Sequence, residues 1–323
     1  MNPLTYLAVL AVAGWHDPSP HRVRFVEVEP GIRLEVLDWG GPGRAVVLLA
    51  GAGNTAHVFD DFAPKLTDHW HVYGITRRGF GASSQPDAGY DDQRLADDVL
   101  RVLDSLGIEA PVLVGHSMAG GEMTTLARQH PNRISGLVFL DALGDPRDWS
   151  GSDPAYMALA RALPASMRTP PPPPSGAEAK SFAGFREWEL RNQKFAPPEA
   201  ELRNQYRTNP DGTKGERIST QRIWTAIGYG QVKRDYSGIH VPVLALYPFI
   251  RLGSTAEKPE ERAAIAAYNA ATAVYVDRWN ANLLSQTSDV HFVDMPDCGH
   301  YVFLACEARV LNALRPFLEG LPQ

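Results

Sequence analysis

Only two cysteines, Cys298 and Cys306, occur among the 323 residues, so a network of disulfides cannot hold this fold together. Their separation of eight residues does not place them within bonding distance, and free thiols are the expected state. Basic residues are not in excess: 31 lysines and arginines stand against 37 acidic residues, and the net charge of −6 disfavours nucleic acid as a partner. Because no run approaches the ~18–20 apolar residues of a membrane span, no membrane-spanning helix is expected.

The chain does contain a short apolar segment near its start, Leu4 to Ala13, which ends in Ala11-Val12-Ala13. Small residues on either side of a larger one are typical of a signal-peptidase site, but no Lys or Arg precedes the segment. Residues 1–13 are therefore interpreted either as a signal peptide or as a loose apolar arm. The first interpretation predicts a periplasmic or secreted protein that begins near Gly14, and the second a cytoplasmic one.

The hydrophobic pattern predicts a mostly parallel sheet with an antiparallel edge. Residues 22–29 and 32–38 alternate apolar and polar side chains around the turn Pro30-Gly31, which is typical of a hairpin with one wet face. Short, nearly continuous apolar runs then indicate strands buried on both faces, at 45–50, 71–75, 112–114, 136–140, 241–247 and, as the last strand, 290–293. Amphipathic helices are expected at 91–106, closed by Gly107, and at 302–318. This alternation predicts a doubly wound α/β fold.

The alternation of strands and helices stops between residues 146 and 236. This segment contains the proline run 170–174, several broken helical patterns and many aromatic residues. Because the apolar run 241–247 resumes the same sheet, we interpret 146–236 as a helical cap inserted into a core formed by 14–145 and 237–323. A second independent domain is the alternative.

A candidate nucleophile lies at Gly115-His116-Ser117-Met118-Ala119, directly after a buried strand and before a helical run. A serine held at the apex of such a strand–turn–helix needs small residues two positions before and two positions after it, and Gly115 and Ala119 meet that demand. In this arrangement the oxyanion of an acyl-transfer reaction is held by the backbone N–H of the next residue, Met118, and by one from an earlier strand end. The small-residue turn Ala50-Gly51-Ala52-Gly53 offers Ala52 as that second donor.

The base and the acid are expected at the ends of later strands. Of ten histidines, only His300 combines a loop after the last predicted strand with the chain order Ser…His. Asp141 ends the strand that follows the serine and can orient an imidazole, whereas the strand at 241–247 is followed by no carboxylate before Glu257. Asp141 is therefore the predicted acid, with Glu257 and Asp145 as alternatives. A simpler role for Asp141 is to cap the next segment.

These motifs resemble the α/β-hydrolase superfamily, in its serine-nucleophile, esterase- and lipase-like branch. The resemblance covers about 22–140 and 241–318 and includes the loop Arg78-Gly79-Phe80-Gly81, while the cap is not matched. It implies an eight-stranded, mostly parallel sheet with helices on both faces. Ala50 stands in place of the family's usual His, and Thr76 where an Asp often precedes the Arg-Gly loop. Haloalkane dehalogenases and some lipases and lactonases are similar in carrying the acid after the strand that follows the nucleophile, which supports Asp141.

The sequence thus predicts a serine hydrolase that cleaves a small-molecule ester or lactone without a metal or an organic cofactor. A serine at position 117 disfavours dehalogenase and epoxide hydrolase chemistry, in which the family has an Asp there. The cap aromatics suggest an apolar pocket, or simply a cap core: Trp149, Tyr156, Phe182, Phe185, Trp188, Phe195, Trp224 and Tyr229. A low-turnover sensor, an aminopeptidase with Glu187 and Glu189 as its acidic pair, and a C–C hydrolase or lyase remain alternatives. The oligomeric state is left open.

Overall fold

The computed structural model describes residues 15–144, 153–247 and 258–322. Several predictions made from the sequence fall outside these ranges: the signal peptide or arm at 1–13, the alternative acids Asp145 and Glu257, and the cap residue Trp149. In the described ranges, none of the helices combines the length and the apolar content that crossing a bilayer requires.

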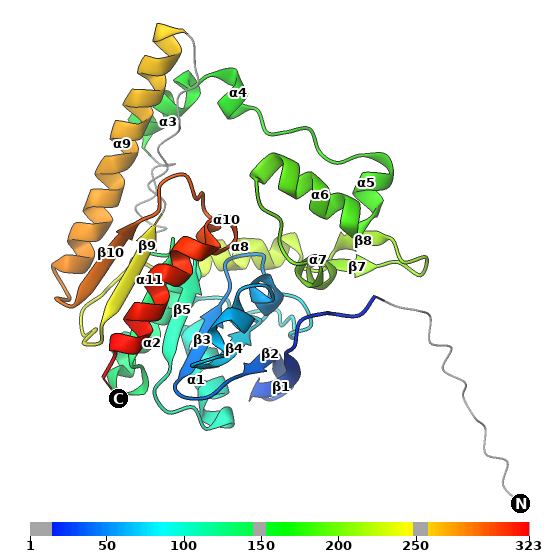
Figure 1. The fold of residues 1–323 in the computed structure, drawn as a ribbon, viewed down its shortest axis with the longest axis vertical. Helices are drawn as coiled ribbons and strands as arrows, with labels where there is room; N and C mark the ends of the chain where they lie inside the picture. Colours follow the sequence, from blue (N-terminus) through cyan, green and yellow to red (C-terminus); the bar gives the residue numbers. More distant parts are fainter. Residues whose placement is uncertain (1–14, 145–152, 248–257, 323) are drawn as a thin grey trace, which may run out of the picture.

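The chain folds around one eight-stranded sheet with the order β1-β2-β4-β3-β5-β6-β9-β10 (Figure 1). The antiparallel hairpin of β1 and β2 forms one edge, β2 also pairs antiparallel with β4, and the remaining pairs are parallel. The strand bounds are β1 Arg22–Glu29, β2 Ile32–Gly40, β3 Ala45–Leu49, β4 His71–Ile75, β5 Val112–His116, β6 Gly136–Leu140, β9 Val243–Tyr247 and β10 Val290–Asp294. The predicted eight-stranded, mostly parallel sheet is therefore confirmed.

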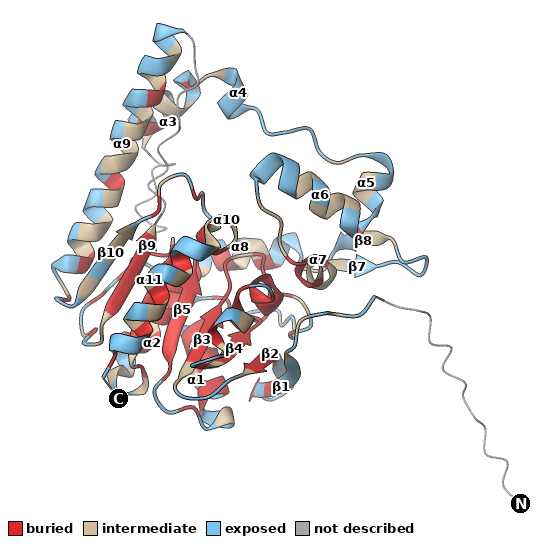
Figure 2. Cartoon of the chain, in the orientation of Figure 1, coloured by how far each residue is buried: buried red, intermediate tan, exposed pale blue. Residues whose placement is uncertain are grey.

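The inner strands are buried on both faces because successive side chains enter two different cores. In β3, Val47 and Leu49 pack into one core while Val46 and Leu48 pack into the other. This explains why the inner strands read as continuous apolar runs rather than as alternating ones. Figure 2 shows the buried residues concentrated in the sheet and in the elements that flank it.

Helices cover both faces of the sheet. Residues of α1 and α2 line the first core, and residues of η1, η2, α10 and α11 line the second. The helices of the core are η1 Ala56–Phe59, η2 Ala63–Leu66, α1 Asp92–Leu106, α2 Ala119–Gln129, η3 Pro131–Arg133, α10 Val302–Ala305 and α11 Glu307–Gly320. Helix α1 begins with Asp91 as its N-cap and ends at Gly107, as predicted. The single closing helix predicted at 302–318 is wrong, because the chain breaks at Cys306 between α10 and α11.

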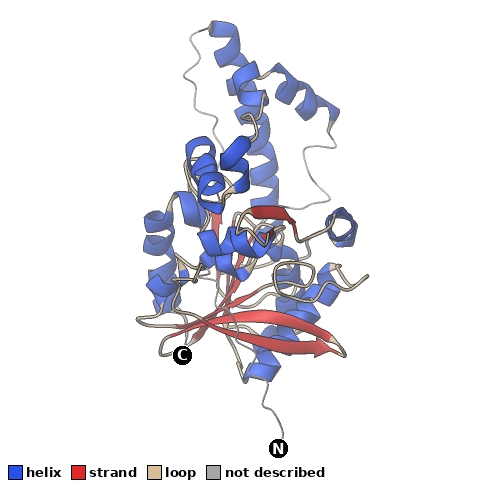
Figure 3. Ribbon diagram, turned by 90° about the vertical axis from the view of Figure 1, so that its right-hand side faces the viewer, coloured by secondary structure: helices blue, strands red, loops and turns tan. Residues whose placement is uncertain are grey.

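Between β6 and β9 the described chain forms short helices, which is consistent with the predicted helical cap. It also forms a small antiparallel hairpin that sequence reasoning did not predict. Their bounds are α3 Pro154–Ala162, α4 Ala165–Arg168, α5 Gly176–Lys180, α6 Phe182–Gln193, α7 Glu199–Gln205, β7 Tyr206–Thr208, β8 Lys214–Arg217 and α8 Gln221–Gly230. Figure 1 shows α3 and α4 beside α9 and α5 and α6 on the other side, all toward the end of the molecule away from the C-terminus, and Figure 3 shows helices at that end in a view turned by 90°.

A second element missed by sequence reasoning is the 26-residue helix α9 (Pro259–Leu284), which lies between β9 and β10. It packs against α3, where the hydroxyls of Tyr156 and Thr272 lie 3.1 Å apart and Tyr275 donates a hydrogen bond of 2.7 Å to Asp153. The upper part of this end of the molecule is therefore built from two separate stretches of the chain.

Candidate active site

Ser117 lies at the turn between strand β5 and helix α2, where its backbone is left-handed with a φ of 56°. A φ in this region is strained for a residue other than glycine, and it persists only where the surroundings hold it. The Ser117 amide donates to the carbonyl of Leu140 at the end of β6 (3.2 Å), which fixes the turn to the neighbouring strand. Met118 follows as the N-cap residue of helix α2 and is buried.

The residues around Ser117 must be small because strand β5 and helix α2 pack closely there. A Cβ placed on Gly115 would overlap the sulfur of Met123 and come within 3.0 Å of the Ala119 Cβ, so strand and helix approach too closely for a side chain there. A Cβ on Gly120 would overlap the backbone carbonyl of Ala142, which cannot move cheaply. The sequence requirement for small residues at 115 and 119 thus has a steric origin in this structure.

The structure brings together the three residues predicted as nucleophile, base and acid. His300, in the loop after β10, places Nε2 2.9 Å from Ser117 Oγ and Nδ1 2.6 Å from Asp141 Oδ2. When Nδ1–H donates to the carboxylate, Nε2 is left as the acceptor for the serine hydroxyl. Asp141 directly follows β6, with a left-handed φ of 47°, and its amide donates to Leu246 of the adjacent strand β9 (2.8 Å). The alternatives Asp145 and Glu257 lie outside the described residues.

The small-residue turn after β3 lies directly beside the serine. A Cβ on Gly51 would be 3.1 Å from the Ser117 Cβ, and Gly53 adopts a φ of 82°, so both glycines allow the backbone to come close. Asn54 N–H donates to the Gly51 carbonyl (3.2 Å) and closes the turn around Ala52. Ala52 and Met118, the two predicted oxyanion donors, both contact one apolar cluster.

A buried ion pair that sequence reasoning missed supports both halves of this arrangement. Arg77, after β4, donates two hydrogen bonds to Glu122 of helix α2 (2.9 and 2.6 Å) and one to the carbonyl of Ala50 (2.9 Å). Burial raises the pKa of the Glu122 carboxyl, although the Arg77 guanidinium opposes that shift. One arginine thus links the predicted oxyanion turn, residues 50–53, to the helix that follows the predicted nucleophile Ser117. No local pattern distinguishes Arg77 from its neighbour Arg78, which instead pairs with Asp98.

His116 is a second residue whose role the sequence did not reveal. It is buried beneath the site, and its Nε2 donates to the carbonyl of His300 (2.9 Å), while its ring lies 4.6 Å from the His300 ring. Burial, together with the charge of His300, lowers its pKa to about 3, so this imidazole stays neutral. His116 therefore positions the backbone of the histidine loop from below.

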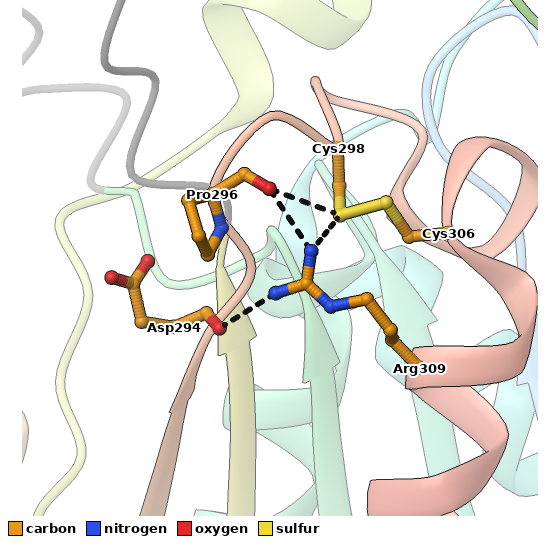
Figure 4. The surroundings of a disulfide bond; sticks show 5 residues. All are labelled: Asp294, Pro296, Cys298, Cys306 and Arg309. Atoms are coloured by element: carbon orange, nitrogen blue, oxygen red, sulfur yellow. Dashed lines mark hydrogen bonds between the residues drawn. A yellow bond between two sulfur atoms is a disulfide. The ribbon is translucent and has the colours of Figure 1, made fainter.

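The histidine loop carries a disulfide, which corrects the expectation of free thiols. Cys298 and Cys306 are bonded, with their Cα atoms 5.5 Å apart, because the chain turns back at Gly299 (φ 61°) and through the single turn of α10. Figure 4 shows Arg309 of α11 against this bond, donating to the carbonyls of Pro296 (3.0 Å) and Asp294 (3.4 Å). The linear separation of the cysteines could not reveal this reversal.

The cap reaches the oxyanion turn through a buried carboxylate. Glu201 of α7 accepts hydrogen bonds from the side chain of Asn54 (2.9 Å) and from the backbone and hydroxyl of Thr55. Burial raises the pKa of Glu201, against the effect of these hydrogen bonds. Burial and the Glu201 charge also raise the pKa of Tyr301 to about 12, so its hydroxyl stays protonated and donates to Asn54 Oδ1 (3.0 Å). Cap, oxyanion turn and histidine loop therefore share one polar network.

Apolar side chains from core and cap lie beside the two candidate oxyanion donors. Ile223 and Ile227 of α8 pack with Phe80 and Met118, and Trp224 meets Phe80 edge to face at 5.8 Å and covers Gly53. Other cap aromatics lie outside this cluster. They are Tyr156 against α9, Phe182 against Arg203, and Phe185 against Trp188 and Tyr206, while Phe195 contacts Tyr301 and Tyr229 is exposed.

The two glutamates considered for binding an amine do not form a pair. Glu187 and Glu189 lie two positions apart on helix α6, so they project from different faces. Glu187 is exposed, and Glu189 accepts a hydrogen bond of 2.7 Å from Gln193 on the same helix.

Comparison with known proteins gives one family and one fold. A family model described as the alpha/beta hydrolase fold matches residues 44–305. The chain is 36% identical over 121 residues to epoxide hydrolase A of Mycobacterium tuberculosis, covering 36% of this chain and 38% of that protein. The curated relatives are matched over less than half of their own length.

Two solved structures are similar over nearly their whole length. An E-2-(acetamidomethylene)succinate hydrolase has a TM-score of 0.64 at 19% identity, covering 93% of this chain and 100% of that one. A serine hydrolase involved in carbazole degradation has a TM-score of 0.61 at 19% identity, covering 93% of this chain and 99% of that one. At these identities the structural similarity shows the fold alone.

Proposed function

Since the chain belongs to the α/β-hydrolase fold family, we propose that it is a serine hydrolase that cleaves a carboxylic ester or lactone of a hydrophobic small molecule. The observation that carries the proposal is the continuous hydrogen-bonded series from Asp141 through His300 to Ser117, at 2.6 and 2.9 Å. This is the order of acid, base and nucleophile that acyl transfer to a serine requires.

In the proposed mechanism, His300 Nε2 takes the proton of Ser117 Oγ as that oxygen attacks the acyl carbon. Asp141 holds the imidazole in the productive tautomer and stabilises the imidazolium that forms. The backbone N–H groups of Ala52 and Met118 hold the oxyanion. His300 then protonates the leaving alcohol, and water activated by the same imidazole hydrolyses the acyl-enzyme.

The apolar cluster beside the oxyanion turn supports an apolar acyl or alcohol group. Phe80, Met118, Ile223 and Trp224 belong to this cluster, and apolar side chains beside the acyl group retain a ligand mainly by removing apolar surface from water. Epoxide hydrolase A, a relative by its sequence, is named for epoxides. The serine at position 117 favours ester chemistry here, because the family's epoxide hydrolases carry an Asp at the corresponding turn.

Two alternatives are less well supported. The aminopeptidase interpretation loses its acidic pair, because Glu187 is exposed and projects away from Glu189. A low-turnover sensor would not need a base aligned with the serine, whereas His300 lies within hydrogen-bonding distance of it. A C–C hydrolase or lyase would use the same three residues and is distinguished by its products.

The test is hydrolysis of p-nitrophenyl esters of increasing acyl length by the wild type and by Ser117→Ala. We expect sustained turnover that falls to background in the variant, while circular dichroism shows an unchanged fold. A control variant, Ser285→Ala, changes an exposed serine at the end of α9 and should keep full activity.

A fluorophosphonate should label Ser117 once per chain, and mass spectrometry of the labelled peptide identifies the site. Retained turnover in Ser117→Ala would overturn the nucleophile. One equivalent of p-nitrophenol followed by no turnover would favour the sensor.

A further inference from the structure

Two histidines and two aspartates that take no part in the series Asp141–His300–Ser117 converge between the N-terminal segment 15–21 and helix η1. Asp60 Oδ1 and Oδ2 lie 2.9 Å from the Nδ1 atoms of His21 and His57, respectively. Asp17 Oδ2 lies 3.3 Å from His57 Nδ1 and 3.7 Å from His21 Nε2. One ligand-capable atom from each of the four side chains lies within 4.8 Å of all the others.

The spacing of these atoms matches that of a small tetrahedral site. Zinc binds imidazole nitrogen and carboxylate oxygen at about 2.0–2.1 Å, which separates neighbouring ligand atoms by roughly 3.3 Å. The separation of 3.3 Å between His57 and Asp17 equals that value, and the separation of 2.9 Å between His57 and Asp60 lies somewhat below it. Two imidazoles and two carboxylates also form a donor set that suits zinc.

The atoms around the cluster hold the candidate ligands in place. Glu35 Oε1 lies 3.6 Å from His57 Nε2, on the side of the ring opposite Nδ1, and Glu35 is itself fixed by the Thr76 hydroxyl (2.8 Å). The Ser19 amide donates to Asp17 Oδ1 (3.0 Å), which leaves Oδ2 directed at the histidines. A carboxylate behind a metal-binding imidazole is a usual outer-shell partner, because it fixes the orientation of the ring.

The cluster is buried and attracts positive charge. The side chains of His21, His57 and Asp60 are only 5%, 5% and 3% exposed. Asp17, Asp60 and Glu35 each place a carboxylate oxygen within 3.7 Å of an imidazole nitrogen of His21 or His57. Three carboxylates beside two imidazoles therefore favour a cation at this position.

A route from solvent leads to the cluster. A cavity of about 700 Å³ between the N-terminal segment, η2 and the cap is lined by Asp17 and Asp60. Its lining contains more carboxylates than cationic side chains, namely Asp17, Asp60, Asp61, Glu199 and Glu307 against Lys65 and Arg186. An entering divalent cation would meet a favourable field before it reached the ligands.

We propose that Asp17, His21, His57 and Asp60 bind one divalent transition-metal ion, preferentially zinc, in a closed structural site. With four protein ligands the site keeps no open position for a substrate, so its role is to hold the fold rather than to perform chemistry. The ion fastens segment 15–21 to η1, whose N-cap Thr55 is also bound by Glu201 of the cap. The region that the ion holds together thus adjoins the oxyanion turn. The proposal does not depend on the reaction assigned to Ser117.

The test begins with the full chain freed of metal by a chelator and dialysis. Titration with ZnCl₂, followed by calorimetry and by elemental analysis after gel filtration, should give one zinc per chain and a higher unfolding temperature. Tetrahedral Co²⁺ should produce its characteristic visible absorption in the same protein.

His21→Ala should weaken zinc binding by more than the roughly 10–100-fold that loss of an outer-shell partner costs. Asp17→Asn, on the same N-terminal segment, provides a second variant should His21→Ala misfold. The matched control is His69→Ala, which removes an exposed histidine that lies 3.8 Å from Asp68. It should bind zinc like the wild type. Absence of saturable binding, or equal binding by His21→Ala, Asp17→Asn and the wild type, would overturn the proposal.

Discussion

The turn around Ser117, which is the predicted nucleophile elbow (residues 115–121), is held by packing, whereas the histidine loop (residues 295–306) is held by cross-links. In the elbow every residue except Ser117 is buried, and the glycines lie against neighbours that leave no room for a side chain. In the histidine loop Asp297 and His300 are exposed, and the loop is tied down by the disulfide, by Arg309 and by His116 (Figure 4). Two hydrogen bonds join the two regions, one from His116 to the His300 carbonyl and one between Ser117 and the His300 ring.

This difference separates two ways in which the site can fail. A packed turn tolerates a change in solvent composition. It does not tolerate a larger side chain, because its close contacts leave no free space. A cross-linked loop tolerates many exposed substitutions but loses its geometry when a link is removed. Three sets of variants perturb, in turn, the contact between Ser117 and His300, the packed region and the cross-linked region.

The largest effect is expected from Asp141→Asn, which disturbs the hydrogen bond between Ser117 and His300 while leaving both regions folded. An amide can donate to Nδ1 and so favour the wrong tautomer of His300, which removes the acceptor for the serine proton. By analogy with the serine-protease triad, kcat should fall on the order of 10⁴-fold, measured with the preferred p-nitrophenyl ester.

The control for this variant is Asp104→Asn, which changes an exposed aspartate paired with Arg133 (2.8 Å) and should leave kcat unchanged. A small effect of Asp141→Asn would move the role of the acid to Glu257 or Asp145.

The next effect concerns packing at the elbow. Gly120→Ala places a methyl group on the Ala142 carbonyl, so it should lower the free energy of unfolding by about 3 kcal/mol. Gly228→Ala is a matched change within helix α8, where nothing lies within 4 Å of the new methyl group. It should be neutral or stabilise the protein by up to ~1 kcal/mol. Urea unfolding midpoints of the two variants give the comparison, and equal midpoints would contradict the packing argument.

A smaller effect is expected from breaking the cross-link of the histidine loop. Closing a loop this short stabilises a protein by roughly 2–3 kcal/mol in the chain-entropy account, and reduction should remove that amount. Dithiothreitol should lower kcat for the wild type, since His300 lies inside the closed loop.

The double variant Cys298→Ser/Cys306→Ser is the control, because it should start with the lower kcat and not respond to the reductant. If both proteins lost activity equally, the reductant would be acting elsewhere. Persistence of the bond in the purified protein would also favour an oxidising compartment over the cytosol.

The parts of the molecule that the sequence could predict are those governed by local pattern and by the topology of parallel strands. Buried parallel strands read as apolar runs, and their carboxyl ends meet at one edge of the sheet. Ser117 and Asp141 were therefore expected to lie together, and the structure brings both to His300. Their catalytic roles remain predictions.

The parts that could not be predicted depend on contacts between distant segments. The disulfide requires a chain reversal that a separation of eight residues does not encode. Helix α9 has apolar residues on all sides, so its sequence lacks the amphipathic periodicity from which a helix is predicted. No local pattern singles out His21, yet its side chain is only 5% exposed and lies beside His57, 36 positions along the chain.

The last prediction tests how His116 holds the histidine loop. Its pKa of about 3 in the folded protein lies below the ordinary value of 6.5, so between these pH values the unfolded chain binds the proton more readily. Stability from His116 is therefore fully present above pH 6.5 and declines on acidification toward pH 3, by at most about 1.4 kcal/mol per pH unit. His116→Gln retains a donor for the His300 carbonyl but cannot titrate, so its free energy of unfolding should fall less steeply. Urea titrations of both proteins between pH 7 and pH 4 measure the two slopes, and parallel curves would show that His116 is already protonated, or relaxed, in the folded protein.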